Sequence, residues 1–350
     1  MTPKLLYLDH AATTPLLPQA GDALVGGFAL WANPSSPHKA GRAARAALED
    51  ARERFKALLG WSGEVIFTSG ASEALTLAIN ASKQPLAAVS AVEHEAVLRH
   101  AVGAKRLEVD ASGRVDPASA GLAGLVAVQQ VNSETGVVQP LDSIATAVRD
   151  AGGRLLADCA QGAGKLALPD ADMIALAAHK FGGPIGVGAL LVRDWAMLEP
   201  GGGQERGYRG GTENLPGVLG MVAALEAGSQ WLGEAARLRA MLESGIIAAS
   251  GEIVAASAER CPTIGAYRMP GMAAAVQLIR FDGMGIAVSA GSACSSGSLR
   301  TSHVLAAMGL DEKAASETIR VSIGRETTEA DIRHFLENWR KIAASARAAA

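Results

Sequence analysis

The stretch of sequence that decides the fold covers residues 154–184 and reads RLLADCAQGAGKLALPDADMIALAAHKFGGP. It contains two short, mostly apolar runs, at residues 154–157 and 173–177, and polar residues follow each run. Apolar runs of this length that do not alternate with polar residues are typical of parallel strands buried on both faces. Ligands of such sheets bind at the carboxyl ends of the strands. The stretch therefore predicts an α/β fold with Asp158 and Lys180 at a ligand site.

The same pattern extends over the first 240 residues. Helical stretches, of which residues 41–59 and 141–151 are the clearest, separate the further apolar runs. The alternation predicts a mainly parallel sheet that helices cover on both faces. The further runs cover residues 64–68, 87–90, 125–131 and 188–192.

The pattern changes in the last third of the chain, where short segments replace the regular alternation. A long helix is predicted over residues 221–247, and a final helix is predicted over residues 329–346. No internal repeat or proline-rich linker separates the two parts. We therefore predict a large domain over residues 15–240 and a smaller α+β domain formed by residues 1–14 and 241–350.

Composition and charge exclude several classes of protein. The 32 Lys and Arg residues against 35 Asp and Glu residues give a formal net charge of −3, so the chain lacks the basic excess that binds nucleic acid. No run approaches the ~20 apolar residues of a membrane-spanning helix. Lys4 and Asp9 interrupt the start of the chain, where a signal peptide would be apolar. We therefore expect no direct nucleic-acid partner and no membrane partner.

The chain has three cysteines, Cys159, Cys261 and Cys294. Their odd number argues against a disulfide framework, and their spacing is not that of zinc ligands, so we expect a reducing, cytoplasmic location. Cys294 stands in a loop rich in Gly and Ser that is predicted over residues 289–298. The thiol is either reactive or a small buried filler. Structural cysteines prefer packed apolar surroundings, so the loop favours a reactive thiol.

Two glycine-containing stretches are candidate binding loops. Residues 69–73, Ser-Gly-Ala-Ser-Glu, follow a predicted strand and open a predicted helix, whose free N–H groups would bind an anion. The alternative is a capped helix start without a ligand, which is common in α/β folds. Residues 201–217 are glycine-rich and long for a connection, and long loops in compact domains are usually functional.

Lys180 follows the predicted strand at residues 173–177. A lysine in this place forms a Schiff base when burial or nearby cations lower its pKa, and the alternative is an ordinary surface lysine. Asp158 ends the preceding predicted strand and favours the Schiff base. A buried carboxylate needs a cationic partner, and a protonated pyridine nitrogen is one. His94 either stacks on a flat ring or lies in solvent at a helix start.

Eleven short motifs follow one another between residues 5 and 325. They are DHAATTP (9–15), NPSSPH (33–38), TSGASE (68–73), EH (93–94), NSETG (132–136), DCAQ (158–161), HK (179–180), GGGQERG (201–207), RGGTEN (209–214), GSAC (291–294) and IRVSIGR (319–325). Each motif is weak alone, but the ordered series resembles the pyridoxal-phosphate-dependent cysteine desulfurases of the class V aminotransferase family. The setting of Cys294 is similar to that of the NifS/IscS-like branch.

The resemblance implies a fold, a cofactor and a role for individual residues. It implies the fold of PLP-dependent transferases of fold type I, with a mainly parallel sheet of the seven-stranded type in the large domain, and pyridoxal 5'-phosphate bound through Lys180. Asp158 would contact the pyridine nitrogen, and His94 would stack on the ring. The other implied cofactor contacts are Gln161 and Ser133 near the ring hydroxyl, and Ala71, Ser72, His179 and Thr212 at the phosphate.

The resemblance also implies how the substrate is bound and what becomes of it. Asn33 and Arg320 would bind the carboxylate of L-cysteine. The product would be L-alanine, and the sulfur would pass to Cys294 as a persulfide, for iron–sulfur cluster assembly or tRNA thiolation. Thr212 would reach the site of a second subunit, which implies a homodimer. The chain would have no metal site of its own, although Cys294 could share an iron–sulfur cluster with a scaffold protein or pass its sulfur to another acceptor.

Two positions depart from the family pattern. Ala177 stands where the family usually has serine, which removes one hydrogen bond to the phosphate, and Ser133 stands where many members have asparagine. A hydrogen bond to a charged group contributes ~1.5–3 kcal/mol, so we expect cofactor binding to be weaker by about tenfold to a hundredfold. Two alternatives to a desulfurase stay open: a selenocysteine lyase or other β-elimination enzyme, and a binding relative without activity.

Overall fold

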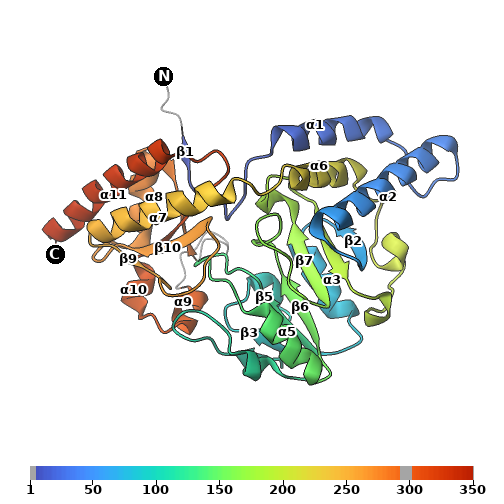
Figure 1. Cartoon of the computed structure of the whole chain (residues 1–350), viewed down its shortest axis with the longest axis horizontal. Helices are drawn as coiled ribbons and strands as arrows, with labels where there is room; N and C mark the ends of the chain where they lie inside the picture. Colours follow the sequence, from blue (N-terminus) through green and yellow to red (C-terminus); the bar gives the residue numbers. More distant parts are fainter. Residues whose placement is uncertain (1–4, 292–301, 350) are drawn as a thin grey trace.

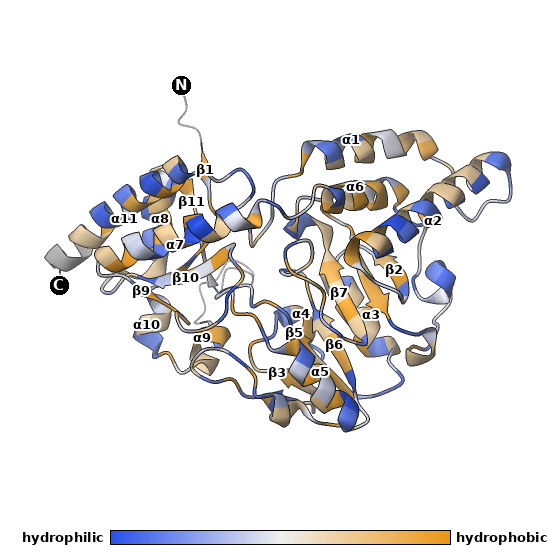
Figure 2. Cartoon of the chain, in the orientation of Figure 1, coloured by the Kyte–Doolittle hydropathy of each residue, from blue (hydrophilic) through white to orange (hydrophobic). Residues whose placement is uncertain are grey.

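The computed structural model describes residues 5–291 and 302–349. The chain forms two parts that lie side by side in Figure 1, each built on its own sheet. The first core consists of the hydrophobic clusters on the two faces of a seven-stranded sheet, and the second core packs against a four-stranded sheet. Figure 2 shows the apolar strands of the larger sheet between helices that carry both hydrophilic and hydrophobic residues. Cys294 and most of the loop predicted around it lie outside the described residues.

The seven-stranded sheet is mainly parallel, as predicted. Strands β3 to β7 pair in parallel, whereas β8 runs antiparallel to both of its neighbours. Every residue of β5, β7 and β8 is buried, as expected for strands covered on both faces. In spatial order the strands are β2 (Glu64–Thr68), β8 (Gly188–Val192), β7 (Met173–Ala177), β6 (Arg154–Asp158), β5 (Leu125–Gln129), β3 (Leu86–Ser90) and β4 (Lys105–Leu107).

Helices cover the two faces of this sheet. The two faces can be followed along β7, because Ile174 and Leu176 join one core cluster, and Met173 and Ala175 join another. The first face packs against α1 (Pro18–Gly27), α2 (Lys39–Leu59), α5 (Leu141–Asp150) and α6 (Leu215–Glu226). The second face packs against α3 (Ala71–Ala81) and α4 (Glu95–Leu98).

Helix α2 shows how local sequence sets the ends of an element. His38 precedes the helix, and its Nδ1 accepts a hydrogen bond from the N–H of Gly41 at 3.1 Å. Gly60 ends the helix in the left-handed conformation, with φ of 63°, which glycine adopts without steric strain. The helix predicted over residues 41–59 is thereby confirmed, and it begins two residues earlier.

The second core lies on an antiparallel sheet. Residues near the N-terminus join this core through Leu8, and β1 (Leu6–Tyr7) pairs in parallel with β11 (Ile286–Ala287). The sheet contains β12 (Ser289–Ala290), β13 (Thr318–Ser322), β10 (Ile264–Arg268) and β9 (Glu252–Ile253). The helices of this part are α7 (Leu232–Ala248), α8 (Ala274–Gly283), α9 (His303–Ala307), α10 (Glu312–Ser316) and α11 (Glu329–Ala349).

The single helix predicted over residues 221–247 is wrong. The structure has two helices there, α6 and α7, separated by residues 227–231. Gly228 adopts a φ of 71°, which interrupts a right-handed helix, and the break coincides with the passage of the chain from the first core to the second. Helix α7 packs in the second core although it begins before residue 240, and the domain boundary at that residue stays a prediction.

Within the described ranges, no helix is long and apolar enough to cross a membrane.

Candidate active site

A cavity of about 410 Å³ opens at the carboxyl edge of the seven-stranded sheet. This volume lies within the range of small-molecule sites. Residues at or just after the ends of five strands, β2, β3, β5, β6 and β7, line the cavity together, as the sequence predicts for the polar residues there. The cavity-lining residues that were predicted as site residues are Ala71, Ser72, His94, Ser133, Asp158, Gln161, His179, Lys180 and Arg320.

The N-terminus of α3 forms one end of the cavity. Gly70 precedes the helix with φ of 153°, and no side chain caps the first N–H groups. Ala71 and Ser72 line the cavity at this point. Glu73 binds back to the N–H of Ser69 at 2.5 Å, and its other oxygen pairs with Nε of Arg209 at 2.9 Å. The first turn of α3 thus presents N–H groups to the cavity, in the geometry that binds an anion.

Lys180 and Asp158 reach the cavity from neighbouring strands, β7 and β6. Nζ of Lys180 donates hydrogen bonds to the carbonyl oxygens of Ala11 and Ala12 at 2.7 and 2.9 Å. Asp158 is buried, and its Oδ1 accepts a hydrogen bond from the N–H of Ala160 at 2.9 Å. Burial raises the pKa of the Asp158 carboxyl, and the positive charges of His94 and Lys180 partly oppose that rise. A cation placed against this carboxylate would relieve the desolvation.

Three further side chains line the cavity between these groups. His94 lies at the N-terminus of α4, and its Nδ1 accepts a hydrogen bond from the N–H of Ala96 at 3.1 Å. Gln161 donates to the carbonyl of Ala11 at 2.8 Å, and its Oε1 is buried without a hydrogen-bond partner in the described chain. Burial, with the charges of Lys180 and Lys165, lowers the pKa of His179 to about 4, so this imidazole is neutral at pH 7.

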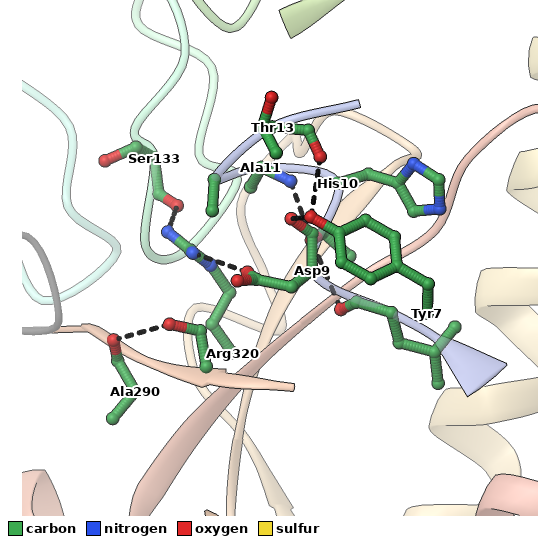
Figure 3. Close-up of polar contacts among 12 residues, drawn as sticks. Tyr7, Asp9, His10, Ala11, Thr13, Ser133, Ala290 and Arg320 are labelled. Carbon is green, nitrogen blue, oxygen red and sulfur yellow. Dashed lines mark hydrogen bonds and ion pairs between the residues drawn. The ribbon is translucent and has the colours of Figure 1, made fainter. Parts of the chain in front are cut away.

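Arg320 reaches the cavity from β13, in the second core. Its Nη1 donates to the carbonyl of Ser133 at 3.0 Å, and its Nη2 pairs with Oδ1 of Asp9 at 2.8 Å. Figure 3 shows the guanidinium held between these two partners. Nε of Arg320 is buried, and no described residue accepts a hydrogen bond from it. The cavity is therefore completed by a cation from the smaller sheet.

Two predicted site residues that the structure describes, Asn33 and Thr212, do not line this cavity. Asn33 is exposed, and its Oδ1 accepts a hydrogen bond from the N–H of Ser35 at 2.8 Å. Thr212 is also exposed and is not among the residues that line the cavity. Cys294 lies outside the described residues. The roles predicted for these three residues stay predictions.

Three carboxylates that neighbour residues of the cavity without lining it were not assigned roles from the sequence. Asp9 holds Arg320, and Glu93 lies fully buried with Oε1 accepting a hydrogen bond from the N–H of Gln129 at 2.6 Å. Glu134 is buried and accepts a hydrogen bond from the hydroxyl of Ser302 at 2.5 Å. All three belong to motifs of the ordered series, which was the available signal. In the parts of the chain that the structure describes, no cluster of His, Cys, Asp or Glu could hold a metal ion.

The sheet order and the lysine that follows β7 are those of the fold type I class of pyridoxal-phosphate enzymes. The family described as "Aminotransferase class-V" matches residues 6–335, and the chain belongs to this family. A cysteine desulfurase of Cereibacter sphaeroides is 37% identical over 364 residues, covering 95% of this chain and 94% of the relative. A cysteine desulfurase IscS of Anaeromyxobacter sp. (strain Fw109-5) is 36% identical, covering 95% and 90%.

Solved structures of similar proteins have the same fold as this chain. A structure named "NIFS-LIKE PROTEIN" superimposes with a TM-score of 0.88 at 28% identity, covering 97% of this chain and 99% of that chain. A structure described as "SspA in complex with cysteine" superimposes with a TM-score of 0.79 at 29% identity, covering 92% of this chain and all of that one. The predicted fold class is confirmed.

Proposed function

We propose that this chain is a pyridoxal-phosphate-dependent cysteine desulfurase, which converts L-cysteine to L-alanine and passes the sulfur to Cys294 as a persulfide. The observation that carries the proposal is the single cavity in which Lys180, Asp158 and Arg320 meet. Relatives of similar length that are named cysteine desulfurases support it, at 35–37% identity. The structure described as SspA with cysteine supports cysteine as the substrate.

The residues of the cavity fit pyridoxal 5'-phosphate. The uncapped N-terminus of α3, with Ala71 and Ser72, suits the phosphate. Asp158 would face the pyridine nitrogen, which supplies the cation that its buried carboxylate needs. The buried Oε1 of Gln161 lacks a donor in the described chain, and the ring hydroxyl would provide one. When bound, the cofactor supplies an electron sink for the reacting amino acid.

The remaining cofactor contacts follow from the lining of the cavity. His94 and Ser133 would contact the ring, and His179, neutral at pH 7, would contact the phosphate. Ala177 also lines the cavity with a side chain that has no hydrogen-bonding group. One phosphate contact usual in the family is therefore absent from this position.

Lys180 would carry the cofactor and move a proton. Two backbone carbonyls, of Ala11 and Ala12, fix its Nζ at the floor of the cavity. A lysine amine can take a proton from one carbon of the substrate and return it to another carbon, provided that both carbons lie within reach of its nitrogen. The segment that contains Ala11 and Ala12 would thus position the Lys180 amine, which accepts and donates the proton.

Arg320 would bind the substrate carboxylate. Its Nε is buried without a partner in the described ranges, and its pairing with Asp9 uses a different nitrogen, Nη2. A guanidinium offers five N–H donors, so a carboxylate can bind while Asp9 keeps its contact. Asn33 would add an amide to this site, although it is exposed in this chain.

The active form would be a homodimer in which Thr212 of one chain closes the phosphate site of the other. The base of its loop is fixed, because Glu205 forms a buried ion pair with Arg52 at 2.8 Å and accepts a hydrogen bond from the N–H of Phe67 at 3.1 Å. Thr212 is exposed, and Ile185 at the cavity is 80% exposed. An exposed hydrophobic side chain beside a site suits coverage by a second copy.

The cellular role would be sulfur supply for iron–sulfur cluster assembly or tRNA thiolation in the cytoplasm. The partner would be a sulfur acceptor or an iron–sulfur scaffold protein, and Cys294 could share the scaffold's cluster.

Analytical sedimentation tests the proposed homodimer, and an active monomer at assay concentration would refute it.

Product analysis tests the proposed activity. The purified, cofactor-loaded protein is incubated with L-cysteine and a reductant, and alanine and sulfide are followed together. A desulfurase gives alanine and sulfide in equal amounts. Pyruvate in place of alanine would identify a β-elimination enzyme, turnover of selenocysteine alone would identify a selenocysteine lyase, and a protein that binds cofactor without turnover would be a binding relative.

A further inference from the structure

Lys180 also lines a second, smaller cavity. It has a volume of about 30 Å³, which is room for about two water-sized particles. It shares Ala11 and Lys180 with the active-site cavity, and its other polar side chains are different. They include His10, Lys165 and Arg325.

The charges around this small cavity are all of one sign. Lys165, Lys180 and Arg325 are cations, and none of the described residues that line the cavity is Asp or Glu. Among the described residues, neither Lys165 nor Arg325 takes part in an ion pair. The undescribed residues, 1–4, 292–301 and 350, contain no Asp or Glu that could change this balance.

The guanidinium of Arg325 is held by neutral groups. It donates hydrogen bonds to the carbonyl oxygens of Ala227 and Gly228, at 3.3 and 2.6 Å. It also lies 5.6 Å from the centre of the Trp231 ring. These contacts orient the cation without neutralising its charge, because carbonyls and an aromatic face carry no net charge.

His10 adds an imidazole to the lining of the small cavity. The side chain is 91% buried, since 9% is exposed, and its Nδ1 has no hydrogen-bond partner in the described part of the chain. Tyr7 packs edge-on against the ring at 5.0 Å, and the backbone of Gly324 lies so close that a Cβ there would stand 2.1 Å from Cε1. Burial, with the charge of Lys165, lowers the pKa of His10 to about 4, so the ring is neutral at pH 7.

A buried cation without a counter-ion is destabilised by loss of hydration. A protein can relieve this by releasing the proton or by binding an anion. Lys165 is half-buried, and desolvation lowers the pKa of its ammonium group. The enclosed volume is too small for a phosphate or a sulfate with its hydration, but it suits a single monatomic anion.

We propose that this cavity is a binding site for a monovalent anion of chloride size, held by Lys165, Arg325 and His10. The anion would lie next to Lys180, which lines both cavities. The proposal concerns residues that hold neither cofactor nor substrate, so it stands or falls separately from the desulfurase activity.

Bromide gives the direct test. Crystals of the cofactor-loaded protein, grown without halide, are soaked in sodium bromide, and anomalous scattering is measured at the bromine edge. The proposal expects a peak in the small cavity within hydrogen-bond distance of Lys165. Water density alone in the cavity, with bromide bound elsewhere or not at all, would overturn it. This measurement needs only the wild-type protein.

A thermal-shift titration gives an independent test in solution. Sodium chloride is exchanged for sodium gluconate at constant ionic strength, so that screening by salt is unchanged. Chloride should raise the melting temperature of the wild type in a saturable way, since a ligand of the native state stabilises it. Lys165→Met should lose this saturable shift, with at least a tenfold weaker apparent affinity.

The matched control is Lys105→Met, which removes one exposed lysine from strand β4. It should keep the wild-type response to chloride. An equal chloride response in wild type and Lys165→Met would overturn the proposal. If Lys165→Met fails to fold, the bromide experiment on the wild type decides alone.

Discussion

The two sides of the active-site cavity differ in how their side chains are fixed. On the sheet side, Asp158 and Lys180 stand within three residues of the strand ends, on strands β6 and β7 that pair directly. On the opposite side, Arg320 comes from the second core and is held by an ion pair with Asp9, 311 positions away in the sequence. Thr212 lies outside the cavity of its own chain. One sheet thus fixes the two groups proposed to hold the cofactor and move the proton. The proposed binding of the substrate and closure of the phosphate site depend instead on the second core and on the loop that contains Thr212.

The largest effect is expected on the sheet side, for Lys180→Ala. This variant removes the amine proposed to carry the cofactor and to move the proton. General acid–base catalysis alone contributes about 10²–10⁴-fold, so turnover should fall at least that far. The visible absorbance of lysine-bound cofactor should disappear as well. Lys105→Ala serves as the control, and surviving absorbance with an unmodified Lys180 in the wild type would break the assignment.

Asp158→Asn should have the next largest effect. The amide keeps the shape of the side chain but loses the charge that would hold the pyridine nitrogen protonated. Loss of a hydrogen bond to a charged group amounts to ~1.5–3 kcal/mol, so cofactor affinity should fall by about tenfold to a hundredfold, and most activity should be lost. Titration with pyridoxal 5'-phosphate, followed by absorbance, measures this. Near-normal turnover would exclude the proposed pairing.

Thr212→Ala tests the part of the proposed site that does not come from the sheet. If Thr212 reaches the phosphate of a second subunit, the variant should bind the cofactor about tenfold more weakly, because one hydrogen bond to a charged group is lost. Thr146→Ala, on the exposed face of α5, is the matched control and should leave the affinity unchanged. Unchanged cofactor affinity in Thr212→Ala would show that the loop does not complete the site.

The smallest effect is expected for Glu93→Gln, and it concerns stability. Burial, together with the charge of Asp158, raises the pKa of Glu93 well above its usual value. Above the usual pKa the unfolded chain binds fewer protons than the folded chain, so the contribution of this group to the free energy of unfolding falls as pH rises. Glutamine does not ionise.

The stability gained by Glu93→Gln should therefore increase from pH 5 to pH 9, as urea unfolding would show. A constant difference from wild type across this range would contradict the buried, protonated state of Glu93.

The residues on the sheet side of the site could be predicted well from the sequence, because the pattern that marks them is local. An apolar run followed by a polar residue defines a strand end, as for Asp158 and Lys180, and strand ends of a parallel sheet meet at one edge. The pairing of Asp9 with Arg320 joins positions 311 residues apart, which no local pattern encodes. The break between α6 and α7 was missed because helical periodicity continues through Gly228, while the passage between two cores is a tertiary property.

The most direct measurement of the central claim is mass spectrometry of Cys294 after a pulse of L-cysteine. A thiolate that attacks the substrate sulfur keeps it as a persulfide, which a reductant removes. The wild type should therefore show one added sulfur on the peptide that contains Cys294, and none after reduction. Cys294→Ser should bind the cofactor normally but lose sulfur transfer by several orders of magnitude, since a neutral hydroxyl is a far weaker nucleophile than a thiolate. Undiminished production of alanine and sulfide by Cys294→Ser would contradict the desulfurase mechanism.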